Sequence, residues 1–183
     1  MNKLYFRYGT MGSSKTAQAL MCRFNYIQKG FSVLLAKPII DTRSTRVESR
    51  IGLSAECLNV KKDESFADIY NQIKPDVIIV DECQFLTKKQ VEDLKELTQY
   101  VPVLCYGLLT NFKTELFEGS KRLVELADSI AEIKSVCKCG RKSTLNARLV
   151  DGKVVVDGPE LLIGADERYE GRCYWCYKKD IKK

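Results

Sequence analysis

Short apolar runs recur along the chain, separated by stretches in which apolar residues return every three or four positions. The runs predicted as strands are Leu4–Tyr8, Phe31–Ala36, Val77–Val80, Val103–Tyr106 and Ile130–Val136. Val77–Val80 has a β-branched residue at every position. That pattern is typical of a strand buried on both faces of a parallel sheet.

The amphipathic stretches between these runs are predicted as helices over Thr16–Gln28, Ser65–Ile73 and Gly119–Ala127. Thr87 and Gln90 form a capping-box pair, which opens a further helix. Strands that alternate with helices predict a parallel α/β sheet. Ligands of such sheets bind at the carboxyl ends of the strands, so chemistry is expected where the runs end.

The polar segment Arg43–Arg50 is predicted as a mobile loop rather than a core element. It carries arginine at positions 43, 46 and 50. One interpretation is a solvated charged face, and the other is that Arg43 meets a transferring phosphate.

After Val136 the helical periodicity disappears, and glycine and cysteine become frequent. We therefore expect an α/β nucleotide-binding domain over residues 1–136 and a small C-terminal annex over residues 137–183. Within the annex, Asp151-Gly152 and Asp157-Gly158-Pro159 are turn signals that flank an apolar run.

The stretch between the first strand and the first helix resembles a phosphate-binding P-loop. It comprises Gly9, Thr10, Met11, Gly12, Ser13, Ser14, Lys15 and Thr16. In a P-loop the backbone N–H groups cradle phosphate oxygens, the lysine reaches the β- and γ-phosphates, and the hydroxyl binds Mg²⁺. Ser14 departs from the motif because a glycine is usual there, and a side chain disfavours any conformation that relies on a missing Cβ.

Asp81 and Glu82 follow the buried run Val77–Val80, where a P-loop protein places its second magnesium ligand. Asp81 is the candidate for that ligand. Three roles stay open for Glu82: a structural carboxylate, a group that activates water in an ATPase, and a general base for an acceptor hydroxyl.

The composition is 45% hydrophobic and 30% charged, which suits a water-soluble domain. The net charge of +6 fits either a solvated surface or an anionic ligand such as a nucleotide. The chain has no histidine, so a general base must be a carboxylate or another side chain. Neither a signal peptide nor a membrane-spanning stretch is predicted, and a cytoplasmic location with reduced thiols is expected.

The cysteines divide into paired and isolated positions. Cys137, Cys139, Cys173 and Cys176 form two close pairs that could supply four thiolates to a structural Zn²⁺, with no position left open for catalysis. The spacing of the first pair is one residue tighter than usual, and four thiols without metal is the alternative. Cys22, Cys57, Cys83 and Cys105 are isolated and are interpreted as small apolar residues.

Taken together, these motifs resemble the type II thymidine kinases over nearly the whole chain. The resemblance rests on the P-loop, Asp41-Thr42-Arg43, the segment Asp81-Glu82-Cys83-Gln84-Phe85, Tyr106-Gly107-Leu108, and Cys137–Lys142. It continues through Ile163-Gly164-Ala165, Glu167-Arg168-Tyr169 and the last cysteine pair. The departures are Ser14 and Ala165, since glycine is common at both positions.

The resemblance implies a RecA-like P-loop fold with a zinc-binding "lasso", formed here by the annex, that closes over the nucleoside. It implies ATP- and Mg²⁺-dependent phosphorylation of the thymidine 5′-hydroxyl, with Glu82 as general base. Lys15, Thr16 and Asp81 match the phosphate and magnesium ligands, and Arg43, Cys83 and Gln84 are also expected at the nucleotide.

The residues expected to line the thymidine pocket by the same resemblance are Phe85, Leu108, Phe112, Phe117, Tyr169, Ile163 and Gly164. Each aromatic or aliphatic member of this set could equally belong to the core. The family is commonly homotetrameric and inhibited by thymidine triphosphate, and it needs neither nucleic acid nor a membrane.

Two other hypotheses remain. A nucleic-acid-binding ATPase with a zinc ribbon would explain the P-loop, the acidic pair, the cysteines and the positive charge, but it does not need the aromatic residues. A non-catalytic nucleotide-binding relative is the second, motivated by Ser14. Salt-dependent DNA binding would support the first, and measurable turnover would exclude the second.

Overall fold

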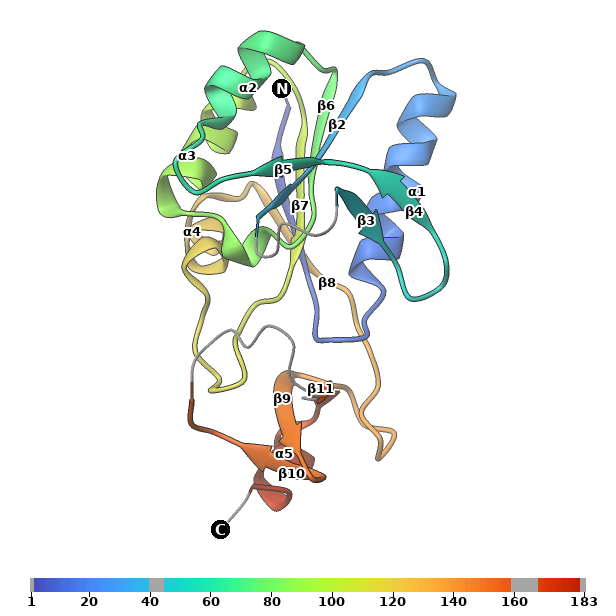
Figure 1. Ribbon diagram of the computed structural model, residues 1–183, viewed down its shortest axis with the longest axis vertical. Coiled ribbons are helices and arrows are strands. Elements are labelled where there is room, and N and C mark those ends of the chain that lie inside the picture. The colour runs from blue at the N-terminus through green and yellow to red at the C-terminus, as the bar shows by residue number, and fades with distance from the viewer. Residues whose placement is uncertain (1, 40–44, 159–167, 182–183) are drawn as a thin grey trace.

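The computed structural model describes residues 2–39, 45–158 and 168–181, and its centre is a parallel six-stranded sheet (Figure 1). The strand order is β5-β2-β6-β7-β1-β8. These strands are β1 (Leu4–Tyr8), β2 (Val33–Pro38), β5 (Leu58–Val60), β6 (Val77–Val80), β7 (Val103–Gly107) and β8 (Ser129–Glu132). The predicted parallel α/β architecture is therefore confirmed, and the edge strand β5 was not predicted.

Helices cover both faces of the sheet (Figure 1). They are α1 (Lys15–Gln28), α2 (Phe66–Ile73), α3 (Lys88–Leu97) and α4 (Glu118–Leu126), with a short 3₁₀ helix, η1 (Cys83–Phe85), after β6. The predicted capping box is in place, since Thr87 and Gln90 form both of its hydrogen bonds. Ser65 caps α2 by accepting a hydrogen bond from the backbone N–H of Ala67.

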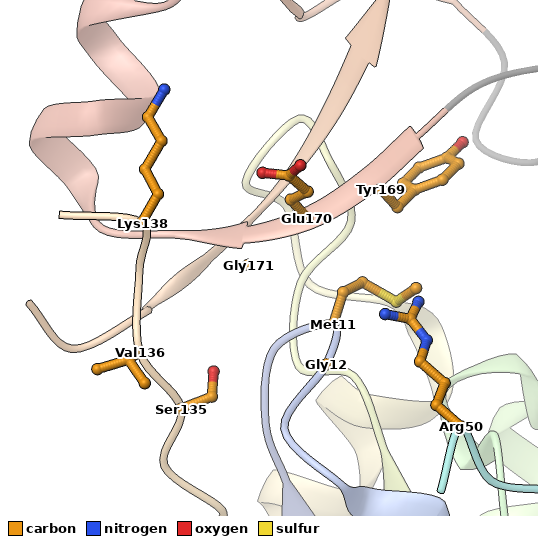
Figure 2. Close-up of a pocket in the computed structure, with 9 residues that line it drawn as sticks. All are labelled: Met11, Gly12, Arg50, Ser135, Val136, Lys138, Tyr169, Glu170 and Gly171. Carbon is orange, nitrogen blue, oxygen red and sulfur yellow. The ribbon is translucent and has the colours of Figure 1, made fainter. Parts of the chain in front are cut away.

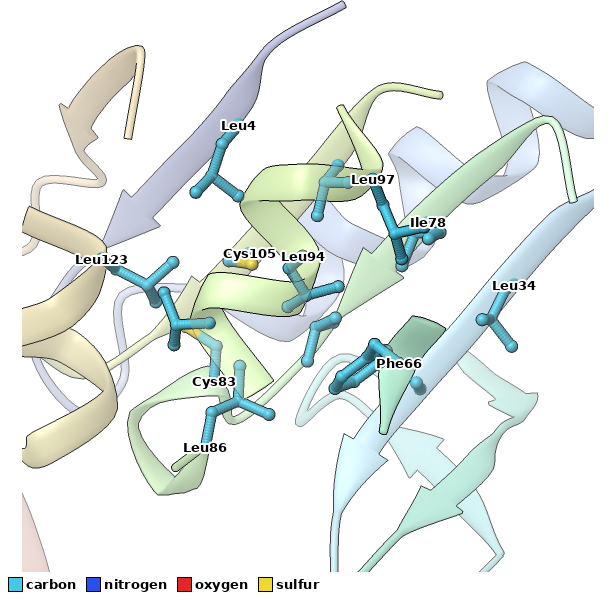
Figure 3. Packing of buried hydrophobic residues seen from close by; sticks show 14 of the residues in the cluster. Leu4, Leu34, Phe66, Ile78, Cys83, Leu86, Leu94, Leu97, Cys105 and Leu123 are labelled. Carbon is cyan, nitrogen blue, oxygen red and sulfur yellow. The ribbon is translucent and has the colours of Figure 1, made fainter. Parts of the chain in front are cut away.

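The alternation of side chains along the strands divides the core into two clusters. On the side of α2, α3 and α4, Ile78 and Val80 of β6 pack with Phe66 and Leu94 (Figure 3). On the other side, Val77 and Ile79 pack with residues of α1. Because β6 is buried on both faces, the position of Asp81 at its end is rigidly set.

The segment around residues 46–56 forms a hairpin of β3 (Arg46–Glu48) and β4 (Ser54–Glu56). The prediction of a loop over Arg43–Arg50 was therefore wrong at Arg46–Glu48. Val47 is buried and joins the core beneath α1 while its neighbours face solvent. This alternation extends over only three residues, which is too short to stand out in the sequence. Residues 40–44, including Arg43, lie outside the described residues.

The annex contains a three-stranded antiparallel sheet in the order β10-β9-β11. Its elements are β9 (Leu145–Val150), β10 (Lys153–Val155), β11 (Arg168–Arg172) and helix α5 (Tyr174–Lys179). It lies at the end of the molecule where β1 and β7 terminate (Figure 1). Within the described part of the chain, no helix is both long and apolar enough to cross a membrane.

Candidate active site

The P-loop runs from the end of β1 into α1, and two of its residues have left-handed backbone conformations. Gly12 has φ 78° and Ser14 has φ 64°. Ser14 therefore adopts the conformation for which the missing glycine is suited. Lys15 folds back over the loop, and its ammonium donates to the Thr10 carbonyl at 2.8 Å and to Ser13 Oγ at 3.4 Å.

Lys15 is enclosed by the loop, and its burial lowers the pKa of its ammonium group, while Glu82 and Asp81 act in the opposite direction. An anion bound in the loop would compensate that lost hydration. The amino end of α1, directly behind the loop, favours the same charge.

Thr16 and Asp81 join the P-loop to the end of β6. The Thr16 hydroxyl donates to Asp81 Oδ2 at 2.9 Å. Burial and then the neighbouring Glu82 charge raise the pKa of Asp81 to about 6, against the Thr16 hydrogen bond and Lys15. A hydroxyl and a carboxylate at this separation are oxygen ligands that suit Mg²⁺, and such an ion would favour the ionised carboxylate.

Glu82 begins η1 with a left-handed backbone conformation, φ 53°, and its side chain is held by a neighbour. Gln84 Nε2 donates to Glu82 Oε2 at 2.5 Å, and Gln84 Oε1 accepts from the backbone N–H of Leu108 at 3.0 Å. Only 2% of Gln84 is exposed. Gln84 therefore faces the carboxylate and the end of β7, while the neighbouring Cys83 is packed into the core.

The β3–β4 hairpin lies over the P-loop and places Arg50 beside it. A Cβ atom on Gly12 would lie 3.9 Å from Arg50 Nη1. Burial is the main cause that lowers the pKa of the Lys15 ammonium, and the positive charge of Arg50 lowers it further. The hairpin tip, the P-loop and Glu82 enclose a cavity of about 190 Å³. The sequence indicated an arginine near the phosphates, but it favoured Arg43 and did not single out Arg50.

A larger cavity of about 660 Å³ adjoins the P-loop on the annex side (Figure 2). Its lining comes from the P-loop, the hairpin, the strand exit after β8 and β11, and comprises Met11, Gly12, Arg50, Ser135, Val136, Lys138, Tyr169, Glu170 and Gly171. In this view Arg50 of the hairpin extends toward Met11, whereas the ring of Tyr169 of β11 points away from the P-loop. The two cavities share Met11, Gly12 and Arg50, so a phosphate site and a second site are contiguous.

The aromatic residues expected at the nucleoside fall into separate places. Phe85 and Phe117 form an edge-to-face pair with ring centroids 5.4 Å apart, close to Glu82 in the chain. Leu108 is partly exposed at the end of β7, next to the Gln84 amide. Tyr169 lines the larger cavity.

Phe112 lies at the junction of the annex with the sheet. Its ring faces the guanidinium of Arg148 at 4.0 Å, and its carbonyl accepts from the Tyr177 hydroxyl at 2.8 Å. Only 2% of Phe112 is exposed, so it supports the junction from inside. Ile163 and Gly164, also expected at the nucleoside, lie outside the described residues.

The four paired cysteines converge at the base of the annex. The sulfur atoms of Cys137, Cys139, Cys173 and Cys176 all lie within 4.8 Å of one another, and those of Cys139 and Cys173 are 3.6 Å apart. Tetrahedral zinc with Zn–S bonds of about 2.3 Å requires sulfurs roughly 3.8 Å apart. The four thiolates are thus grouped closely enough to hold one Zn²⁺.

The electrostatics of the cluster agree with that fit. Burial opposes ionisation of Cys137, but backbone N–H groups of Cys139 and Cys173 lower the pKa of its thiol to about 6. The adjacent Cys139 sulfur, followed by burial, raises the pKa of Cys176 to about 12. A divalent cation would relieve this crowding of sulfurs, because metal binding deprotonates its thiol ligands.

Two residues that lie against the P-loop were missed by the sequence interpretation. Arg50 is one, and Asn146 of β9 is the other: its side-chain oxygen accepts from the P-loop amide of Met11 at 2.8 Å. A single asparagine in an unpredicted strand carries no local pattern, so only the three-dimensional contact reveals it.

The P-loop presents Lys15 and Thr16 near Asp81, which follows a buried parallel strand, and Thr16 is hydrogen-bonded to this aspartate. This arrangement defines a P-loop nucleotide-binding protein. The profile described as thymidine kinase matches residues 2–177. The chain belongs to the thymidine kinase family.

Individual relatives agree with this assignment. A thymidine kinase of Lactococcus lactis subsp. lactis (strain IL1403) is 43% identical over 186 residues, which cover 98% of each chain. A thymidine kinase of Pasteurella multocida (strain Pm70) is 43% identical over 190 residues, covering 99% of each. Among solved structures, the flagellar accessory protein FlaH from Methanocaldococcus jannaschii has a TM-score of 0.47 at 12% identity, over 82% of this chain and 73% of that chain, a likeness too distant to bear on function.

Proposed function

We propose that this protein transfers the γ-phosphate of ATP to the 5′-hydroxyl of thymidine, giving thymidine monophosphate and ADP. The observation that carries the proposal is the joined arrangement of Lys15, Thr16, Asp81 and Glu82 in a chain of the thymidine kinase family. The phosphate-binding residues and the candidate base surround one cavity.

In the proposed reaction, Glu82 takes the proton of the 5′-hydroxyl as its oxygen bonds to the γ-phosphorus. The bond from that phosphorus to the β,γ-bridging oxygen breaks, and ADP leaves with the electron pair. The hydrogen bond from Gln84 to Glu82 Oε2 orients the carboxylate and leaves Oε1 for the proton. Lys15 exchanges its contact with the Thr10 carbonyl for phosphate oxygens.

Thr16 and Asp81 would hold Mg²⁺, which neutralises charge on the β- and γ-phosphates when bound. Arg50 supplies a further positive charge at the hairpin tip, beside the loop backbone. Arg43, for which the resemblance suggested this role, remains a second candidate.

We assign nucleotide binding to residues 1–136 and closure over the nucleoside to residues 137–183. Phe85, Leu108, Phe117 and Tyr169 are proposed to contact thymidine, together with Ile163 and Gly164, and Phe112 to support them from within. Cys137, Cys139, Cys173 and Cys176 are proposed to hold one structural Zn²⁺. Enclosure of the site would exclude water, which otherwise competes for the phosphoryl group.

The outer face of α1 supports a homo-oligomer. Met21, Phe24 and Ile27 lie at helical spacing on this face and are 49%, 59% and 41% exposed. An apolar stripe of this kind is stabilised by burial against a second copy. The family resemblance suggests a homotetramer, and feedback inhibition by thymidine triphosphate, which would span the nucleoside and phosphate sites.

A coupled ADP-release assay with ATP, Mg²⁺ and each deoxynucleoside tests the activity, with the product identified by chromatography. Thymidine-dependent ADP release with thymidine monophosphate as product is expected. ADP release that is independent of any nucleoside would overturn the proposal and favour the nucleic-acid-binding ATPase, for which single-stranded DNA is then the substrate to add.

A further inference from the structure

The annex contacts the P-loop directly, through Asn146. Its Oδ1 accepts from the backbone N–H of Met11 at 2.8 Å, and its Nδ2 donates to the carbonyl of Thr110 at 2.8 Å. Asn146 is 3% exposed, so both bonds are shielded from water. A single carboxamide of β9 thus ties the start of the P-loop to the segment that follows β7.

Three hydroxyl groups form a second contact beside the first. Thr10 Oγ1 lies 2.8 Å from Ser135 Oγ and donates to Ser143 Oγ at 3.1 Å. The fit is close at Gly171 of β11, where a Cβ atom would lie 2.8 Å from Thr10 Oγ1 and 2.9 Å from the Met11 carbonyl oxygen. Figure 2 shows β11 passing Met11 and Gly12 at this point. Only glycine allows that approach.

These contacts flank the cysteine cluster in the sequence. Ser135 lies two residues before Cys137, and Gly171 lies two residues before Cys173. The sulfurs of those two cysteines belong to one cluster, so the segments that touch the P-loop are held at the same point. Loss of the cluster would free both segments together.

The contacts also reach the phosphate-binding lysine. The carbonyl of Thr10 accepts from the Lys15 ammonium, while the side chain of the same threonine is held by Ser135 and Ser143. Because Asn146 occupies the N–H of Met11, the amides left for phosphate are those further along the loop. A loop that is fixed before ligand binding loses less entropy on binding, and its affinity is correspondingly higher.

We infer that Asn146 is a positioning residue for the P-loop, so that the zinc-binding annex sets affinity for the nucleotide donor as well as closing over the nucleoside. The inference rests on the proposed function only in that the P-loop binds ATP. It concerns donor binding, and it is therefore measurable without turnover.

The matched pair of variants is Asn146→Ala and Tyr177→Phe. Both remove buried hydrogen bonding between the annex and the sheet domain. Asn146→Ala removes two bonds, to Met11 of the P-loop and to Thr110, whereas Tyr177→Phe removes one, to Phe112, and none to the P-loop. Dissociation constants of a fluorescent, non-hydrolysable ATP analogue with Mg²⁺ would be measured by titration, with zinc content and melting temperature as structural controls. We expect about tenfold weaker analogue binding for Asn146→Ala, the loss of one well-placed interaction, and a change below about twofold for Tyr177→Phe, with zinc retained in both.

Equal weakening in both variants would overturn the inference, since it would reflect general docking of the annex. An unchanged dissociation constant for Asn146→Ala would overturn it as well. If Asn146→Ala does not fold, Ser143→Ala decides the question, because it removes only a hydroxyl partner of Thr10. About twofold to threefold weaker analogue binding is then expected, and no change would contradict the inference. Thymidine-dependent ADP release by the unmodified protein tests the proposed function separately.

Discussion

The two sides of the candidate active site are built by different means. On the nucleotide side, Asp81 and Glu82 follow a strand buried on both faces, and large apolar clusters on each side of the sheet fix their positions. On the annex side, the apolar cluster is small and comprises Ala147, Leu149, Val154 and Tyr177 with two partly buried neighbours. A core of that size stabilises little, so the annex depends on its thiolate cluster and on contacts with the sheet.

This difference predicts which part of the molecule a substitution on each side should affect. A change in the cysteine cluster should disorder the annex and leave the sheet folded. A change at the end of β6 should alter chemistry or local charge and leave the annex intact. The following variants test this separation.

Cys173→Ser gives the largest expected effect. Removing one thiolate from a four-thiolate site should abolish zinc binding, and structural zinc contributes on the order of 10 kcal/mol to folding of small metal-binding units. We expect loss of zinc by metal analysis, rapid proteolysis within residues 137–183, and turnover below detection, while the sheet still unfolds cooperatively. Cys57→Ser, at an isolated and partly exposed thiol, is the control and should keep its zinc. Full zinc retention by Cys173→Ser would contradict the four-thiolate site.

Glu82→Gln is expected to have the next largest effect. The amide cannot accept the 5′-hydroxyl proton, and loss of a general base lowers turnover by roughly two to four orders of magnitude. Binding of the ATP analogue and zinc content should be preserved, because Glu82 is hydrogen-bonded to Gln84 and, among the described residues, to none of the annex. Turnover equal to that of the unmodified enzyme would exclude the role of general base.

Asp81→Asn should change stability and activity in opposite directions on the nucleotide side. Burial, then Glu82, raises the pKa of Asp81 to about 6, so the folded state holds its proton more tightly than the unfolded chain does. Ionisation therefore destabilises the fold as pH rises from about 4 to about 6, by about 3 kcal/mol at most for a shift of this size. We expect Asp81→Asn to lose activity while its melting temperature, measured without Mg²⁺, exceeds that of the unmodified protein increasingly as pH rises over this interval. A difference that does not change with pH would contradict the assignment.

The sequence predicted the nucleotide side well because its signals are local. The β-branched run Val77–Val80, the capping box at Thr87 and the P-loop are each complete within a few residues, and the structure has them as expected. The cysteine pairs were also found from spacing, and their sulfurs do converge. Local patterns of this kind can be recognised in the sequence without knowledge of tertiary contacts.

The remaining features depend on contacts between distant segments. Gln84 was expected at the nucleotide, but its burial and its bonds to Glu82 and Leu108 follow from the packing of η1 against β7. Asn146 contacts Met11 across 135 positions of sequence. The β3–β4 hairpin was missed because each strand spans only three residues. No period or spacing in the chain encodes these relations.

Ser14→Gly gives the smallest expected effect and examines the one position where the P-loop departs from its motif. Ser14 has φ 64°, and its side chain makes no capping hydrogen bond with α1. A left-handed conformation costs a non-glycine residue about 1–2 kcal/mol, while glycine loses about 0.5–1 kcal/mol in unfolded-state entropy. We therefore expect Ser14→Gly to stabilise the protein by about 0.5–1 kcal/mol in denaturant unfolding and to leave affinity for the ATP analogue equal or higher. Ser13→Gly is the neighbouring control, and it should instead destabilise, because Ser13 is buried and its hydroxyl accepts from Lys15. A large loss of analogue binding in Ser14→Gly would mean that the serine hydroxyl itself contacts the nucleotide.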